Sequence, residues 1–139
     1  MKKILITGGS GFIGTNFINY LSKKKIQILN IDKLSSISTQ EKFKKIYFKK
    51  NYNFIKYDLK NTSIIYSILK KFAPNYIINF AAESHVDRSI TDPIYFIKNN
   101  IITSTNLFYA YSRMINKNKI KFFHISTDEV YGSIKKGSF

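Results

Sequence analysis

The apolar positions along the chain fall into short continuous runs separated by stretches of wider spacing. The short runs are rich in β-branched and aromatic residues and occupy positions 2–7, 26–31, 53–57, 76–80 and 121–126. Runs of this length are typical of strands that are buried on both faces of a parallel sheet. The pattern therefore predicts five strands.

Between these runs, apolar residues recur every three or four positions, as they do on one face of a helix. The first helix is expected to bury a face made of Phe12, Ile13, Phe17, Ile18 and Leu21. A second helix is predicted over 63–72, with Pro74 marking its exit, and a long third helix from Pro93, with Asp92 as its cap. The polar, basic segment 35–52 is predicted to be a loop, with a helix as the alternative. Strands alternating with helices predict an α/β fold, a Rossmann-type doubly wound parallel sheet of about five strands.

The composition fits one domain of this kind. The chain has 139 residues, of which 44% are hydrophobic, and it contains no cysteine. A disulfide framework and a thiolate metal site are thereby excluded, and we predict no metal. No run approaches the roughly 18 apolar residues of a membrane helix, so we expect a cytoplasmic protein without a membrane partner.

The net charge of +15 raises the alternative of nucleic-acid binding, because clustered lysines attract phosphate backbones. The lysines are scattered along the chain, however, in segments that we expect to be helix ends and loops. We interpret them as a compositional bias spread over the surface, and nucleic acid is not the expected partner.

A glycine-rich turn connects the first strand to the first helix. Gly9, Gly11 and Gly14 satisfy G-x-G-x-x-G, while Gly8, Gly11 and Gly14 satisfy the wider G-x-x-G-x-x-G spacing. Such a turn lets the backbone approach a pyrophosphate, whose charge the helix amides meet. Asp32 ends the next strand and is predicted to accept from the adenosine ribose hydroxyls, which favours NAD over NADP. Lys33, beside it, keeps NADP open.

Polar residues also follow the fourth and fifth strands. Asp128 and Glu129 come after the apolar run 122–125, so we expect a buried strand to carry them to the ligand-binding edge as a general acid and a general base. After the fourth strand, Ala81 and Ala82 are small enough for a ligand to lie against the backbone. His85 is interpreted as structural.

Four motifs together resemble a known family. The segments 7–14 (TGGSGFIG), 31–34 (IDKL), 81–90 (AAESHVDRSI) and 124–132 (HISTDEVYG) resemble the extended short-chain dehydrogenase/reductases, and within them the dTDP-glucose 4,6-dehydratases. The resemblance spans almost the whole chain but only about the first two-fifths of a family member.

The resemblance implies a redox-neutral elimination on a nucleoside diphosphate sugar. The C4 hydroxyl is oxidised by hydride transfer to NAD, Glu129 takes the C5 proton, Asp128 protonates the leaving C6 hydroxyl, and the hydride returns to C6. Thr127 would hold the sugar O4, and Ser84 would also touch the substrate. Asp58 is expected near the adenine. The resemblance assigns the following residues to the cofactor: Gly8, Gly11, Phe12, Ile13, Gly14, Asp32, Lys33, Leu34, Ser35, Asp58, Leu59, Phe80, Ala81, Ala82, Glu83, Ser84 and Asn99.

The chain differs from the family at several positions. The family's Tyr-x-x-x-Lys pair follows the fifth strand, beyond Phe139, and the spacings that occur here begin at four tyrosines outside that place: Tyr20, Tyr52, Tyr66 and Tyr131. Asn99 replaces a threonine, and Thr103 replaces a packing glycine. Residues 1–139 are therefore expected to be a truncated NAD-binding domain, without the later strands and the substrate domain. The full-length form is expected to be a homodimer that uses the helix beginning near Pro93.

Three alternatives stay open. The chain could be a non-catalytic NAD-binding remnant, a basic nucleic-acid-binding protein with a Rossmann core, or an epimerase or decarboxylase of the same superfamily. The adjacent Asp128 and Glu129 favour elimination over epimerisation, because a C4 epimerase needs no acid and base for C5 and C6.

Overall fold

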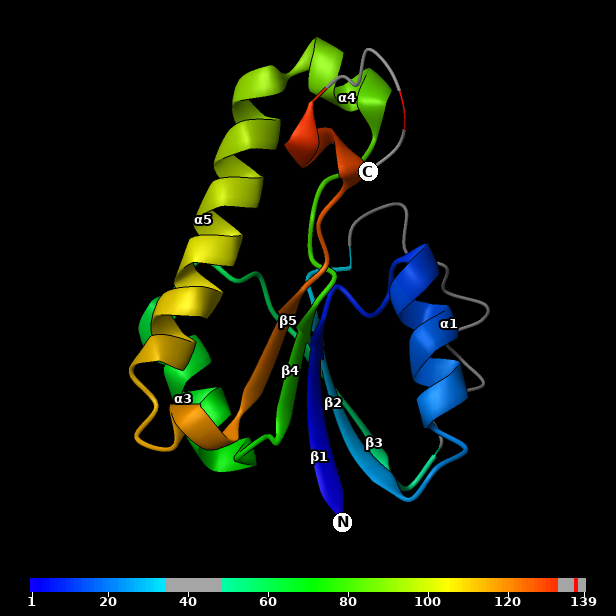
Figure 1. The fold of residues 1–139 in the computed structure, drawn as a ribbon, viewed down its shortest axis with the longest axis vertical. Coiled ribbons are helices and arrows are strands. Elements are labelled where there is room, and N and C mark those ends of the chain that lie inside the picture. Colours follow the sequence, from blue (N-terminus) through cyan, green and yellow to red (C-terminus); the bar gives the residue numbers. More distant parts are fainter. Residues whose placement is uncertain (35–48, 133–136, 138–139) are drawn as a thin grey trace.

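The computed structural model describes residues 1–34, 49–132 and 137, and it contains one five-stranded sheet (Figure 1). All strand pairs are parallel, and their order is β3-β2-β1-β4-β5. The strands are β1 (Lys2–Thr7), β2 (Ile26–Asp32), β3 (Tyr52–Lys56), β4 (Tyr76–Asn79) and β5 (Lys121–His124). The predicted Rossmann-type sheet is confirmed. The chain order reverses at β1, so β1 and β4 flank the switch point where ligands of such sheets bind.

Helices cover both faces of this sheet. Helix α1 (Phe12–Leu21) lies on one face, and α3 (Thr62–Phe72) and α5 (Pro93–Ser112) lie together on the other (Figure 1). Three short elements were not predicted: α4 (Val86–Thr91), η1 (Lys117–Lys119) and η2 (Asp128–Tyr131). The prediction for 35–52 falls mostly outside the described residues, and Ser35 is among those left out.

Alternation along the strands divides the core into two layers. Leu5 faces α3 and α5, where it packs with Leu69 and Leu107, and its neighbours Ile4 and Ile6 face α1. Because side chains alternate across a pleated strand, a continuous apolar run supplies both layers at once.

The predicted helix boundaries agree with the local chemistry. Asn61 caps α3 by accepting from the backbone nitrogens of Ser63 and Ile64, and Ala73 closes it in the left-handed conformation at φ 49°. Asp92 caps α5 by accepting from the Tyr95 nitrogen at 3.0 Å, as predicted.

The predicted buried face of α1 is wrong at its first turn. Ile18 and Leu21 are buried, but Phe12 is 69% exposed and Ile13 is 61% exposed. The first turn of α1 lies beyond the end of β1, and no strand in the described part of the chain covers these side chains. They line a cavity there.

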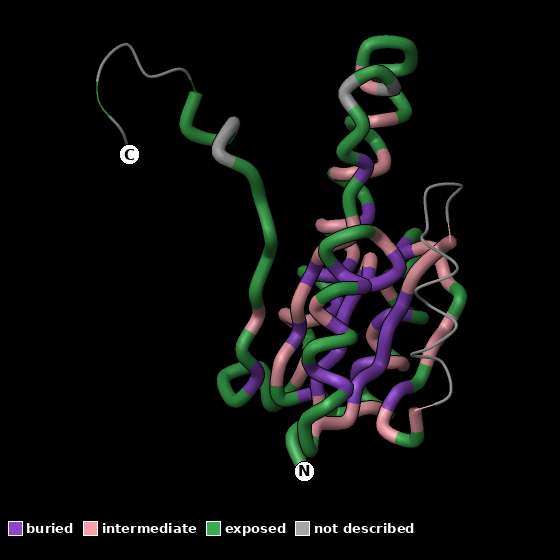
Figure 2. Tube along the Cα trace, turned by 90° about the vertical axis from the view of Figure 1, so that its right-hand side faces the viewer, coloured by how far each residue is buried: buried purple, intermediate pink, exposed green. Residues whose placement is uncertain are grey.

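The expectation of a buried fifth strand is also wrong. Phe123 is 47% exposed and Ile125 is 45% exposed, and Figure 2 shows the segment from β5 onward as mostly exposed. In the described part of the chain β5 pairs only with β4. Phe122 packs against Phe108 and Tyr111, but the described residues cover little else of this strand.

Helix α5 has apolar side chains on its surface as well as in the core. Leu107 and Ala110 are buried, while Ile94, Ile97 and Ile101 are each more than half exposed. None of the helices described here is long and apolar enough to cross a bilayer.

Candidate functional site

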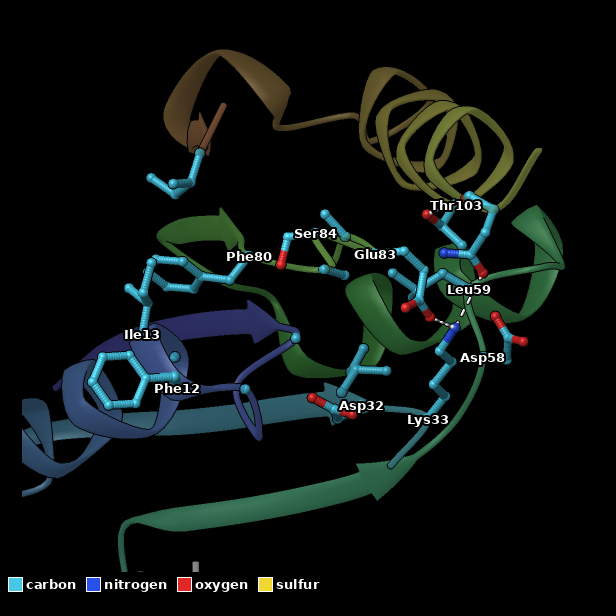
Figure 3. Close-up of a pocket in the computed structure, with 18 of the residues that line it drawn as sticks. Phe12, Ile13, Asp32, Lys33, Asp58, Leu59, Phe80, Glu83, Ser84 and Thr103 are labelled. Carbon is cyan, nitrogen blue, oxygen red and sulfur yellow. Dashed lines mark hydrogen bonds and ion pairs between the residues drawn. The ribbon is translucent and has the colours of Figure 1, made fainter. Parts of the chain in front are cut away.

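A cavity of about 450 Å³ opens at the carboxyl ends of the strands, around the switch point (Figure 3). Its walls come from the glycine turn, the ends of β2 and β3, the segment after β4, α5 and the segment after β5. The lining residues are Gly8, Gly11, Phe12, Ile13, Gly14, Ile31, Asp32, Lys33, Tyr57, Asp58, Leu59, Phe80, Ala81, Ala82, Glu83, Ser84, His85, Asn99, Thr103, Ile125, Ser126 and Thr127.

At two positions of the glycine turn, a side chain would collide with backbone atoms. Gly8 has φ 69°, and a Cβ there would lie 2.5 Å from the backbone nitrogen of Ala81. A Cβ on Gly14 would lie 2.6 Å from the Gly8 carbonyl oxygen. Both contacts are far inside van der Waals distance, so only glycine lets the turn, α1 and the segment after β4 pack this closely.

The structure also distinguishes the two glycine spacings. Gly8, Gly11 and Gly14 line the cavity, whereas Gly9 is buried beneath it and donates its backbone N–H to Asn30 Oδ1 at 3.0 Å. The wider G-x-x-G-x-x-G spacing therefore describes the wall of the cavity.

Asp32 is held in place by the backbone on both sides. Its Oδ2 accepts from the Ser10 nitrogen at 2.9 Å, and its Oδ1 accepts from the Leu34 nitrogen at 2.8 Å. Each carboxylate oxygen has a second lone pair, so Asp32 can still accept from a ligand hydroxyl. Leu34 adopts φ 56° and is not among the cavity-lining residues.

Lys33 is tied to three side chains across the cavity wall. Its Nζ lies 2.6 Å from Glu83 Oε1 (Figure 3). It also donates to Asn99 Oδ1 at 3.2 Å and to the Tyr95 hydroxyl at 3.4 Å. Burial by itself lowers the pKa of Lys33, but the hydrogen bond and the negative charge of Glu83 outweigh it and raise the pKa. Lys33 is therefore a compensated cation that joins β2 to α5.

Asp58 presents a carboxylate oxygen without a partner. Its Oδ2 pairs with Lys60 Nζ at 2.8 Å, but its Oδ1 is buried and has no hydrogen-bond partner among the described residues. A buried acceptor left unsatisfied costs free energy, which a donor entering the cavity would recover.

Hydrogen bonds fix the segment that follows β4. Asn79 accepts from the Thr7 hydroxyl and from the Ala81 nitrogen, and its amide contacts His124 Nδ1 at 2.9 Å. Asn100 holds Glu83 in both directions, accepting from its nitrogen at 2.7 Å and donating to its carbonyl oxygen at 2.9 Å. The carboxyl edge is therefore a connected polar framework.

Most of the residues expected around a cofactor come together in this cavity. Exceptions are Leu34, which lies outside its wall, and Ser35, which is outside the described residues. Thr127 and Ser84, the expected substrate residues, both line it. The backbone of Asp128 and Glu129 begins η2 directly after Thr127, and their side chains are not described.

Several residues of the cavity and its supports were not predicted from the sequence. Tyr57 and Ile31 line the wall, and His85, interpreted as structural, also faces the cavity. The buried amides of Asn30 and Asn79 support the turn from below. A buried asparagine at the carboxyl end of an apolar strand is the signal that could have identified these two supports.

The Tyr-x-x-x-Lys spacings in the chain do not reach this cavity. Tyr20 is 60% exposed beneath Lys24 Nζ, and the Tyr52 hydroxyl accepts from buried Asn30. Tyr66 and Tyr131 do not line the cavity either.

The comparisons with known proteins point to one family. A sequence profile described as GDP-mannose 4,6 dehydratase matches residues 5–139. A probable dTDP-glucose 4,6-dehydratase from Sinorhizobium fredii is 38% identical over 99% of this chain and 41% of its own length.

Solved structures agree with this result. The dTDP-glucose 4,6-dehydratase of Bacillus anthracis in complex with NAD superposes with a TM-score of 0.82 at 34% identity, over 100% of this chain and 42% of that one. DesIV, a dTDP-glucose 4,6-dehydratase of Streptomyces venezuelae with NAD and a second ligand bound, gives a TM-score of 0.85 at 29% identity, over 99% of this chain and 43% of that one. The chain thus spans about two-fifths of the length of these relatives.

Proposed function

The chain belongs to the GDP-mannose 4,6 dehydratase family, and from this premise we propose that it is the NAD-binding part of a dTDP-glucose 4,6-dehydratase. The observation that carries the proposal is the cavity at the switch point. The glycine turn, Asp32 and Asp58, whose Oδ1 has no partner among the described residues, line one space there.

The cavity suits NAD along its length. The turn at Gly8 and Gly14 lets a pyrophosphate approach the amides at the start of α1. Asp32 is oriented to accept from the adenosine ribose hydroxyls, and Asp58 Oδ1 is a buried acceptor suited to an adenine amino group. Bound NAD would supply a hydride acceptor and donor for the sugar.

The surroundings of Lys33 favour NAD over NADP. A 2′-phosphate next to Asp32 would be repelled, and Lys33 is the nearby cation that could offset this repulsion. Its charge is already compensated by Glu83 at 2.6 Å. Among the described residues, this corner therefore offers a hydroxyl-accepting carboxylate and no uncompensated lysine.

The chemistry on the sugar is assigned to the segment after β5. We propose that Thr127 holds the sugar O4, that Glu129 removes the C5 proton and that Asp128 protonates the departing C6 hydroxyl, with Ser84 contacting the substrate. Ser84 and Thr127 both line the cavity, which supports a sugar lying between the ends of β4 and β5. Adjacent acids can divide these roles when their environments separate their pKa values.

The relatives are more than twice as long as this chain, so the remaining parts of the active protein are also part of the proposal. The tyrosine and lysine that act on the C4 hydroxyl, and the domain that grips the nucleotide, would come from residues outside 1–139. A homodimer through α5 is supported by the exposed side chains of Ile94, Ile97 and Ile101 on that helix.

The test is an assay of the full-length protein with dTDP-glucose. We expect a product that is lighter by one water and carries a keto group, with no net change in NAD. Glu129→Gln should abolish the product while leaving NAD affinity within about twofold, because it removes the base and not a cofactor contact. UDP- and GDP-glucose, run in parallel, report the nucleoside preference.

Two results would contradict the proposal. Inversion at C4 without loss of water would identify an epimerase. Absence of any product, with NAD binding retained in a calorimetric titration, would identify a non-catalytic NAD-binding protein.

A further inference from the structure

The fold gathers lysines from distant parts of the sequence at the edge of the sheet where its strands begin, opposite the cavity. On one side of this edge, Lys23 to Lys25 follow α1 and lead into β2, whose first residue pairs with Lys2 of β1. Lys50 precedes β3. The neighbouring Lys49 donates to Ser22 Oγ at 2.9 Å, and this hydrogen bond holds the start of β3 next to the turn after α1.

The other side of the same edge is equally basic. Lys70 and Lys71 occupy the last turn of α3, and Lys3 Nζ donates to the Phe72 carbonyl oxygen at 3.1 Å. The backbone nitrogen of Lys121, at the start of β5, donates to Asn75 O at 3.0 Å, which places Lys117 and Lys119 of η1 beside the end of α3. We call these lysines and those of the preceding paragraph the basic edge; it lies around the N-terminus in Figure 1.

The acidic residues that the structure describes lie elsewhere. Asp32 and Asp58 follow the ends of β2 and β3, Glu83 follows β4, and Asp87 and Asp92 lie in or after α4. A compositional bias alone would place lysines on every surface. Of the lysines that the structure describes, four lie outside the basic edge, Lys33, Lys56, Lys60 and Lys98, and the others lie on it. Helix dipoles favour lysines after α1 and α3, but they do not account for those at the starts of strands.

Exposed aliphatic side chains occur within this basic surface. Ile115 is 92% exposed in the turn between α5 and η1, between Arg113 and Lys117, and Met1 is 77% exposed at the start of β1. Isolated aliphatic side chains among lysines suit the headgroup region of a bilayer. The aliphatic side chain inserts between the headgroups, and the lysines pair with anionic lipids. Nucleic-acid phosphates would pair with the lysines but would offer no apolar surface for Ile115 to contact.

We propose that the basic edge docks the protein reversibly on the surface of an anionic membrane, with Ile115 entering the headgroup region. The cavity, at the opposite edge of the sheet, then faces solution and stays open to soluble ligands. Peripheral contact of this kind differs from the expectation of no membrane partner, and it is independent of the dehydratase reaction.

The strength of binding follows from the number of lysines that reach the surface. Each lysine near an anionic bilayer contributes about fivefold to the partition coefficient at physiological salt. The attraction acts within a Debye length of about 8 Å, so it weakens steeply as salt is added.

The experiment is co-sedimentation of the native protein with vesicles made of equal parts phosphatidylglycerol and phosphatidylcholine. We expect binding to these vesicles, release by salt and no binding to pure phosphatidylcholine. The double variant Lys25→Gln/Lys119→Gln should bind roughly 25-fold more weakly. The matched variant Lys56→Gln/Lys98→Gln removes the same charge from exposed positions outside the basic edge and should bind within about twofold of the native protein.

Ile115→Ser separates a membrane from a nucleic acid. We expect it to weaken vesicle binding several-fold and to leave NAD binding and the circular dichroism spectrum unchanged. The proposal is overturned if the native protein does not sediment with anionic vesicles, if the two double variants lose binding equally, or if Ile115→Ser has no effect. Binding to a short RNA oligonucleotide in the absence of vesicle binding would instead assign the basic edge to nucleic acid.

Discussion

The ion pair between Lys33 and Glu83 allows a quantitative prediction. Glu83→Gln keeps the shape of the side chain and an oxygen that can accept from Lys33 Nζ, but removes the negative charge. The Glu83 side chain is 8% exposed and that of Lys33 is 28% exposed, so the pair lies between the surface and buried limits. Exposed pairs contribute up to about 1 kcal/mol, and breaking a fully buried pair costs about 3–5 kcal/mol.

We expect Glu83→Gln to lower the free energy of unfolding by about 1–2 kcal/mol, since Lys33 keeps Asn99 and Tyr95 as acceptors. For a domain of this size, that loss corresponds to a fall in melting temperature of about 3–7 °C. Urea denaturation of the native protein and the variant measures the difference. A cycle that adds Lys33→Gln and the double variant isolates the coupling between the two charges.

The pH dependence gives a second readout of the same pair. The pKa of Lys33 is raised above the ordinary lysine value of 10.5, so its contribution to stability is present below that value and is lost as the pH rises through the raised pKa. The stability difference between the native protein and Glu83→Gln should therefore shrink in strongly alkaline buffer. Lys60→Gln, which removes the exposed partner of Asp58, should leave stability unchanged. A coupling near zero, or an equal loss in Lys60→Gln, would refute the reasoning.

The remaining predictions concern the turn, a helix cap and the cofactor. Gly14→Ala should lower the free energy of unfolding, measured in urea, by at least about 2 kcal/mol, because its Cβ would collide with backbone atoms. Gly11→Ala, whose Cβ would have its nearest contact at an ordinary 3.4 Å, should change the free energy of unfolding by no more than about 0.5 kcal/mol. Equal losses in the two variants would contradict this prediction. Asn61→Ala removes the α3 cap and should cost about 1 kcal/mol by the same measurement, while an unchanged midpoint would mean that water replaces the cap. Glu83→Gln should also leave the charge of Lys33 uncompensated and reduce the preference for NAD over NADP by roughly threefold to tenfold, measured as the ratio of the two dissociation constants in calorimetric titrations. An unchanged ratio would mean that Lys33 does not influence the choice of cofactor.

The sequence by itself determined the sheet and the glycine turn. Strands and helices differ in the period of their apolar residues, and the five short runs were regular enough to place every strand within two residues. Caps such as Asp92 are local interactions, so they too can be read from neighbouring residues. Gly8, Gly11 and Gly14 were identified for the same reason: the turn they form is fixed by backbone geometry within eight residues.

Tertiary structure alone decided which side chains are covered and which meet across the sheet. Phe12 and Ile13 have the same spacing as core residues, but their turn extends past the end of β1, so they line the cavity. The partners Lys33, Glu83 and Asn99 are far apart in sequence, and only the parallel order of the strands brings them together.

The same topology explains the basic edge. Along the chain the lysines are scattered and no local pattern connects them. In an all-parallel sheet every strand begins at one edge and every intervening helix ends there, so residues that recur at those points in sequence converge in space. The sequence determined where each lysine of the basic edge lies within its element. The parallel sheet brought these lysines to one edge, while Asp32, Asp58 and Glu83 lie at the cavity.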